Sequence, residues 1–169
     1  MLRSFNGKSP RVHPTAFISE FAYLVGDIEI GPYASIWPGV VLRADCGKIT
    51  VGANTNIQDG SVVHGDGDVV IGDNVTLGHG VICHAKSVGS DCLLGNNCTL
   101  NDGAIVGDHC IIASGAMVLE NRVIPPRSFV VGGPGQVKSE IQPHQLEVIK
   151  TNAEAYITLG QQHKEQGLE

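Results

Sequence analysis

An aliphatic residue recurs at every sixth position along most of this chain. The series begins at Val12 and ends at Val130, and its spacing changes only in the intervals 42–51, 63–71 and 83–88. An α-helix requires a period near 3.6 residues and a half-buried strand a period of 2, so the pattern predicts neither. The anchors of the repeat are Val12, Ile18, Leu24, Ile30, Ile36, Leu42, Val51, Ile57, Val63, Ile71, Leu77, Cys83, Val88, Leu94, Leu100, Val106, Ile112, Val118, Ile124 and Val130.

Short strands joined by tight corners account for this period. A second small or apolar residue usually stands four positions after the anchor, as at Ala34 and Ala104, and glycine often follows the anchor directly. Three such strands make one triangular coil, and stacked coils pair as parallel strands. The predicted fold class is all-β: a left-handed parallel β-helix of hexapeptide repeats in residues 1–135. Helical spacing in residues 136–169 predicts a C-terminal α-helix that packs on the β-helix.

Composition excludes several classes of partner. The net charge is −6 and the basic residues are scattered, so we expect no nucleic acid and no membrane as a partner. The N-terminal stretch has no apolar run typical of a signal peptide, and we expect a soluble, cytoplasmic protein. An odd number of cysteines, 5, favours a reducing compartment. The repeat places Cys46, Cys92, Cys98 and Cys110 at the small inward position and Cys83 at an anchor, which predicts five core residues.

Two histidines fall into one column when anchors are counted instead of residues. Each of Arg43, His64, His84 and Asn101 follows an anchor of the same edge, three repeats apart. Neighbouring coils lie about 4.8 Å apart, so His64 and His84 are placed to bind one ion at Zn–N distances near ~2.0 Å. Isolated histidines such as His109 are interpreted as solvated.

His79 lies at a different corner. An extended segment from His79 to His84 spans roughly 16 Å, so these two side chains cannot share an ion within one chain, and a neighbouring subunit must supply the third ligand. The predicted metal ligands are therefore His64, His79 and His84. Ligation by histidines with an open fourth position indicates a catalytic site for Zn²⁺, with Fe²⁺ or Co²⁺ as alternatives.

The segments RADCGKITVGANTNIQDGSVVHG and IGDNVTLGHGVICHAKSVGSDCLLG resemble the gamma-class carbonic anhydrases, a likeness that runs from about residue 11 to 135. The resemblance implies a homotrimer with metal sites between subunits and reversible hydration of CO₂ to bicarbonate by hydroxide on the metal. It also implies that Gln58 orients the bound water or bicarbonate. Arg43 with Asp45 or Asp59 would form ionic contacts at the interface, and Asn56 would support the residues around the metal.

Two features leave the function open. The chain has only GDGDVV between His64 and Ile71, without the long acidic loop of the best-known members, so no residue is assigned to proton transfer. Asp66 and Asp68 are candidates for that role, but aspartate beside glycine more often serves a turn. Some relatives are linked to hydrolysis of CoA thioesters, and others are catalytically weak assembly or carrier subunits. A metal-dependent CoA thioesterase and such a carrier homologue are the alternatives to a carbonic anhydrase. A hexapeptide acyltransferase would need a single catalytic base instead of a ligand trio.

Overall fold

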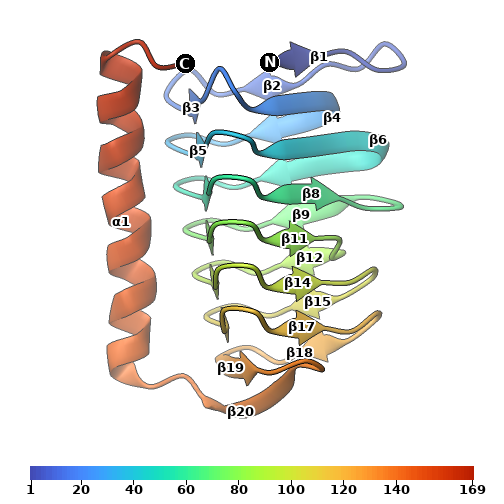
Figure 1. Ribbon diagram of the computed structural model, residues 1–169, viewed down its shortest axis with the longest axis vertical. Helices are drawn as coiled ribbons and strands as arrows, with labels where there is room; N and C mark the ends of the chain where they lie inside the picture. The colour runs from blue at the N-terminus through green and yellow to red at the C-terminus, as the bar shows by residue number, and fades with distance from the viewer.

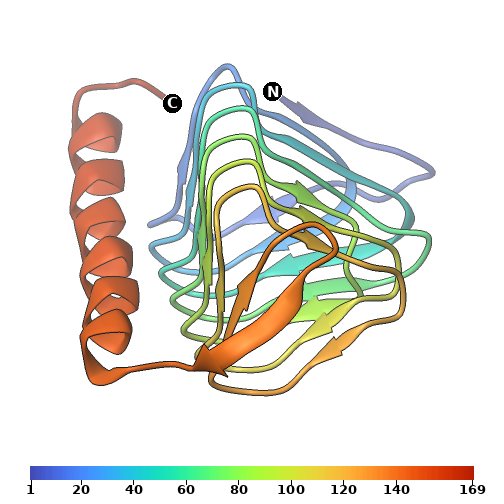
Figure 2. The ribbon, with the colours of Figure 1, turned by 60° about the horizontal axis from the view of Figure 1, so that its bottom comes forward.

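About seven coils stack into a three-sided prism in the computed structural model, which describes all residues from 1 to 169, and a single helix runs along one side (Figure 1). Figure 2 shows the triangular section of the coils. The predicted left-handed parallel β-helix with a C-terminal α-helix is confirmed. It follows from three strands per coil, each burying its anchor against the anchors above and below.

The first and second faces of the prism form one 12-stranded sheet, because β4 (Tyr23–Ile30) and β6 (Val41–Val51) run through the corner between them. The first face continues in β1 (Leu2–Arg3), β8 (Val62–His64), β11 (Ile82–Cys83), β14 (Thr99–Leu100) and β17 (Met117–Val118). The second face contains β2 (Arg11–Val12), β9 (Val69–Ile71), β12 (Ser87–Val88), β15 (Ile105–Val106) and β18 (Val123–Ile124).

The third face is an 8-stranded sheet that carries the helix. Its strands are β3 (Phe17–Ile18), β5 (Ser35–Ile36), β7 (Asn56–Ile57), β10 (Thr76–Leu77), β13 (Leu93–Leu94), β16 (Ile111–Ile112), β19 (Ser128–Val131) and β20 (Gln136–Glu140). All of these strands pair in parallel except β20, which pairs antiparallel to β19 at the end of the prism. The segment from residue 136, predicted to be helical, therefore starts with a strand, and the helix begins only at Pro143.

Helix α1 (Pro143–Glu165) begins after that strand, with proline in its first turn, where the missing N–H is no loss. It packs on β3, β5, β7 and β10. Gly160 allows close approach, because a Cβ there would lie 3.1 Å from Cβ of Ser35. Tyr156 meets Trp37 edge to face, with ring centroids 5.3 Å apart. These contacts place the side chains of α1 beside the corners of the third face.

The core is the stack of anchors that the repeat predicts. Every anchor from Leu24 to Val130 is buried, and four of the five predicted core cysteines are buried as well. Cys46 is exposed, so its placement in the core was wrong. The long interval 42–51 moves the inward position: Ile49 stacks between Ile28 and Val69, and Cys46 lies on the corner of β6.

Candidate metal site

The strand register brings His64 and His84 together. Val63 in the middle of β8 pairs with Cys83 at the end of β11, and each histidine is the next residue along the chain. Nδ1 of His64 lies 3.0 Å from Nε2 of His84. Arg43 is the partner of His64 in β6. The predicted column is therefore present, with the two imidazoles facing each other.

Each of these two imidazoles has its other nitrogen beside a carboxylate. Nε2 of His64 lies 3.0 Å from Oδ1 of Asp45, and Nδ1 of His84 lies 3.3 Å from Oδ1 of Asp102. When both histidines donate their N–H to these carboxylates, two nitrogen lone pairs face each other across 3.0 Å. A divalent cation between them stabilises such an arrangement, since metal-bound histidines commonly donate their remote N–H to a carboxylate. The donor set therefore fits a metal ion.

Asp45 is held in its charged form by Arg43. The guanidinium donates from Nη1 to Oδ2 of Asp45, and this hydrogen bond, aided by the one from His64, lowers the pKa of the carboxyl to about 2. Asp45 thus accepts from His64 as an anion at neutral pH. The predicted ionic contact between Arg43 and Asp45 lies within one chain.

A second group of predicted residues surrounds His79 at another corner. Nδ1 of His79 lies 3.0 Å from Oδ2 of Asp59, which leaves Nε2 free. Asn56, fully buried, donates to Oγ1 of Thr76 and accepts from Nε2 of Gln58. This chain of hydrogen bonds fixes the side-chain amide of Gln58 and leaves its carbonyl oxygen available.

Beside this group lies a hollow of about 290 Å³, lined in part by Gln58, His79, Asn152 and Tyr156. Asn152 and Tyr156 come from α1 and were missed by the sequence reasoning. The hexapeptide pattern ends before α1, so no signal in the repeat connects them with Gln58.

The predicted residues thus form two separate groups. The His64 group contains His64, His84, Asp45 and Arg43, and the His79 group contains His79, Asp59, Gln58 and Asn56. Potential ligand atoms of His64, Asp66 and His84 lie within 4.8 Å of one another, and His79 does not belong to that cluster. A second hollow, of about 330 Å³, lies beside His84 and is lined in part by Asp66 and Asp102. One chain therefore presents two incomplete halves of the predicted trio.

Curated relatives match the chain over nearly its whole length. It is 38% identical over 164 residues to gamma carbonic anhydrase 2, mitochondrial, of Arabidopsis thaliana, which covers 92% of this chain but only 59% of that protein. It is 36% identical to carnitine operon protein CaiE of Escherichia coli (strain K12), covering 90% of this chain and 79% of that protein. The chain belongs to the family of hexapeptide-repeat proteins that includes CaiE, and it is similar over nearly its whole length to the gamma carbonic anhydrases.

The hexapeptide-repeat fold is shared with proteins that carry other names. The family model described as "Bacterial transferase hexapeptide (six repeats)" matches residues 86–120. A hexapeptide transferase family protein from Anaplasma phagocytophilum superposes with a TM-score of 0.93 at 36% identity, covering 96% of this chain and 97% of that one. Because one fold carries several chemistries, activity must be argued from the site. Helix α1 does not combine the length and the apolar character that crossing a membrane requires.

Proposed function

We propose that this protein is a homotrimeric, metal-dependent carbonic anhydrase that interconverts CO₂ and bicarbonate. In each site, one protomer contributes His64 and His84 and its neighbour contributes His79. The observation that carries the proposal is the division of the site: each group has imidazole nitrogen turned away from a supporting carboxylate, and neither group alone has three histidines. Joining two copies brings the set to three.

An apolar stripe on the first face supports assembly beside the histidines. The stripe consists of outward-pointing residues that pair with one another from strand to strand, and only a threonine interrupts it, between the last two. Its residues are Tyr23, Val41, Val62, Ile82 and Met117. Three of these side chains are exposed. A contiguous apolar stripe on a soluble protein marks a contact surface. It leads along the strands directly to the His64 group, so a subunit that covers it lies against the site.

The chain's own residues hold and orient a metal ion. His64, His84 and the neighbour's imidazole are the proposed ligands, and Zn²⁺ suits them, with Fe²⁺ or Co²⁺ as alternatives. Such an ion supplies Lewis acidity and lowers the pKa of bound water. Asp45 and Asp59 keep the ring nitrogens that face them protonated, which directs the opposite nitrogens of His64 and His79 to the ion.

Other residues position the reactants. Gln58 is nearly buried, and its amide orientation is set by Asn56, so its free carbonyl oxygen is placed to accept a hydrogen bond from water in the adjoining hollow. Arg43 keeps Asp45 ionised. The buried free thiols suit a reducing compartment, and we place the protein in the cytoplasm.

Stopped-flow CO₂ hydration on metal-loaded trimer tests the proposal. The wild type should hydrate CO₂, and His84→Ala carried through the same loading should not, since one of three ligands is gone. Hydrolysis of CoA thioesters is measured on the same samples. Thioester hydrolysis without CO₂ hydration would replace the proposed reaction with that of a thioesterase. If His84→Ala kept both activities, the proposed site would be refuted. A metal-loaded wild type that is inactive in both assays would indicate a carrier homologue.

A further inference from the structure

Asp66 lies beside the two facing imidazoles without a structural task of its own. Its Oδ1 is 3.9 Å from Nε2 of His84, the nitrogen that faces His64. The donor atoms of His64, Asp66 and His84 all lie within 4.8 Å of one another. One carboxylate and two imidazoles of a single chain therefore converge on one place.

The loop that carries Asp66 contains two aspartates, of which one accepts a hydrogen bond from the backbone and the other does not. Oδ1 of Asp68 accepts a hydrogen bond from the backbone N–H of Lys48 at 2.8 Å, which ties this aspartate to the neighbouring coil. Asp66 makes no hydrogen bond, its side chain is 76% exposed, and it stands between Gly65 and Gly67. The flanking glycines let the backbone adjust, so this carboxylate is free to move toward His84 by the distance that coordination requires.

We propose that Asp66 is a metal ligand that completes a two-histidine, one-carboxylate set within a single chain. Each protomer then has three donors of its own for a divalent cation, and His79 of a neighbour raises the affinity as a further ligand. The inference rests on the proposed metal site and adds a carboxylate ligand to it. Such a donor set suits Fe²⁺ and Co²⁺.

Removal of His79 isolates the contribution of Asp66. Co²⁺ is titrated calorimetrically into wild type, His79→Ala, and the two double variants His79→Ala/Asp66→Asn and His79→Ala/Asp68→Asn, each checked for folding by circular dichroism. Asp68→Asn is the matched control, because it removes the same charge from the same loop and keeps an oxygen for the N–H of Lys48. We expect His79→Ala to bind one Co²⁺ per chain. Asp66→Asn should then weaken binding at least as much as the loss of an outer hydrogen-bonding partner does, about tenfold.

A second readout separates coordination from simple charge loss. At saturating Co²⁺, the visible absorption of His79→Ala/Asp66→Asn should differ from that of His79→Ala, whereas His79→Ala/Asp68→Asn should retain the parent spectrum. Equal affinities and equal spectra in the two double variants would overturn the role of Asp66. If wild type binds Co²⁺ and His79→Ala does not, the inference fails and the proposed function stands. If wild type itself binds no Co²⁺, the proposed metal site fails as well.

Discussion

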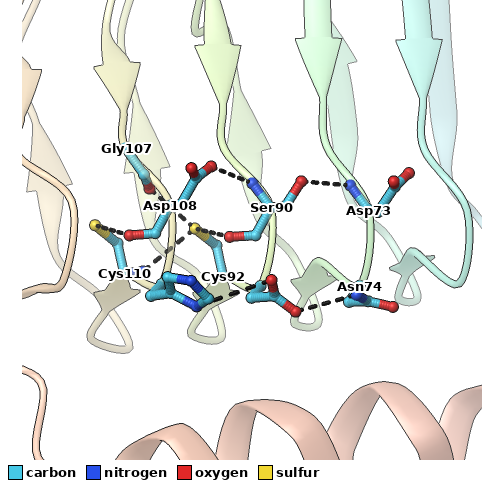
Figure 3. Close-up of polar contacts among 9 residues, drawn as sticks. Asp73, Asn74, Ser90, Cys92, Gly107, Asp108 and Cys110 are labelled. Atoms are coloured by element: carbon cyan, nitrogen blue, oxygen red, sulfur yellow. Dashed lines mark hydrogen bonds and ion pairs between the residues drawn. The ribbon is translucent and has the colours of Figure 1, made fainter.

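Two corners of the prism stack polar side chains from coil to coil, yet only one brings two imidazoles face to face. At the corner shown in Figure 3, Nδ2 of Asn74 donates to Asp91, and Asp91 in turn faces Nδ1 of His109 at 3.8 Å. At the other corner, His64 and His84 stack directly on each other. Both corners thus have histidine beside aspartate, and the difference lies in what occupies the next coil.

The geometry of the turns explains the difference. His109, Asp91 and Asn74 all have positive φ, near 55°, which is a demand of the turn itself and favours Asn and Asp. Beside them, Oδ1 of Asp108 accepts from the N–H of Ser90, so the polar groups of this corner satisfy the backbone (Figure 3). His64 ends a strand instead and has no such task. A histidine beside a carboxylate at a corner therefore does not by itself indicate a metal site, whereas two imidazoles that face each other provide a pair of nitrogen donors.

The largest difference between the corners is expected in metal content. His84→Ala removes one of the two facing imidazoles and should abolish metal binding at neutral pH, whereas His109→Ala should leave it unchanged. Metal per trimer is measured by elemental mass spectrometry after identical loading. If both variants lost metal equally, the two corners would not differ in metal binding and the comparison would be wrong.

The next largest effect comes from joining the two halves of the site. His79→Ala and His84→Ala are unfolded together, refolded and supplied with metal at a level that loads neither parent. About three-quarters of the trimers are mixed in a random assembly, and each has one interface of three with all ligands, so roughly a quarter of wild-type metal and activity should return. Trimers shown by native mass spectrometry to be mixed, yet as metal-free as their parents, would refute a shared site.

Gln58→Ala should preserve the trimer and its metal and reduce turnover ten- to a hundredfold, the usual order for a residue that acts around a metal. The physical reason is that Gln58, oriented by Asn56, makes no hydrogen bond to His79 or Asp59 and is not one of the proposed ligands. Stopped-flow kinetics at matched metal content give the result. Unchanged turnover would remove Gln58 from the reaction.

A smaller effect is expected on the stability of the folded state at acid pH. The pKa of Asp45 is about 2 against an ordinary value of 3.8, so its carboxylate stabilises the folded state above pH 3.8, and that contribution is lost as the pH falls toward 2. Arg43→Ala should raise this pKa, because its hydrogen bond is the main cause of the shift. Carboxyl ¹³C NMR titration measures it, and an unmoved pKa would assign the shift to another group.

The smallest effect belongs to the corner of Figure 3. Cys110 is buried and its sulfur accepts from the backbone N–H of Ser128. Cys110→Ala should cost about 1 kcal/mol of unfolding free energy, as for removal of one methyl-sized group. Its metal content should equal that of wild type. Denaturant unfolding and elemental analysis check both, and loss of metal would show that this corner also supports the site.

Much of the fold and part of the site follow from counting along the chain. The period of six predicts the coils, because each anchor must stack on the anchor three repeats away. The same count aligns His64 with His84 across an irregular interval, and the structure confirms their contact. It failed for Cys46, since a nine-residue interval does not indicate which of its residues turns inward.

The order of residues is enough to predict the β-helix, the column of histidines and the separation of His79 from that column, because these depend on a repeated local pairing. The three-dimensional fold was needed to show that Asn152 and Tyr156 of α1 line the hollow beside Gln58. It alone also placed Asp66 and Asp102 near His84. These contacts involve residues of α1, which lies outside the repeat, and side chains in turns. The positions of these side chains depend on how the helix and the loops pack against the finished prism.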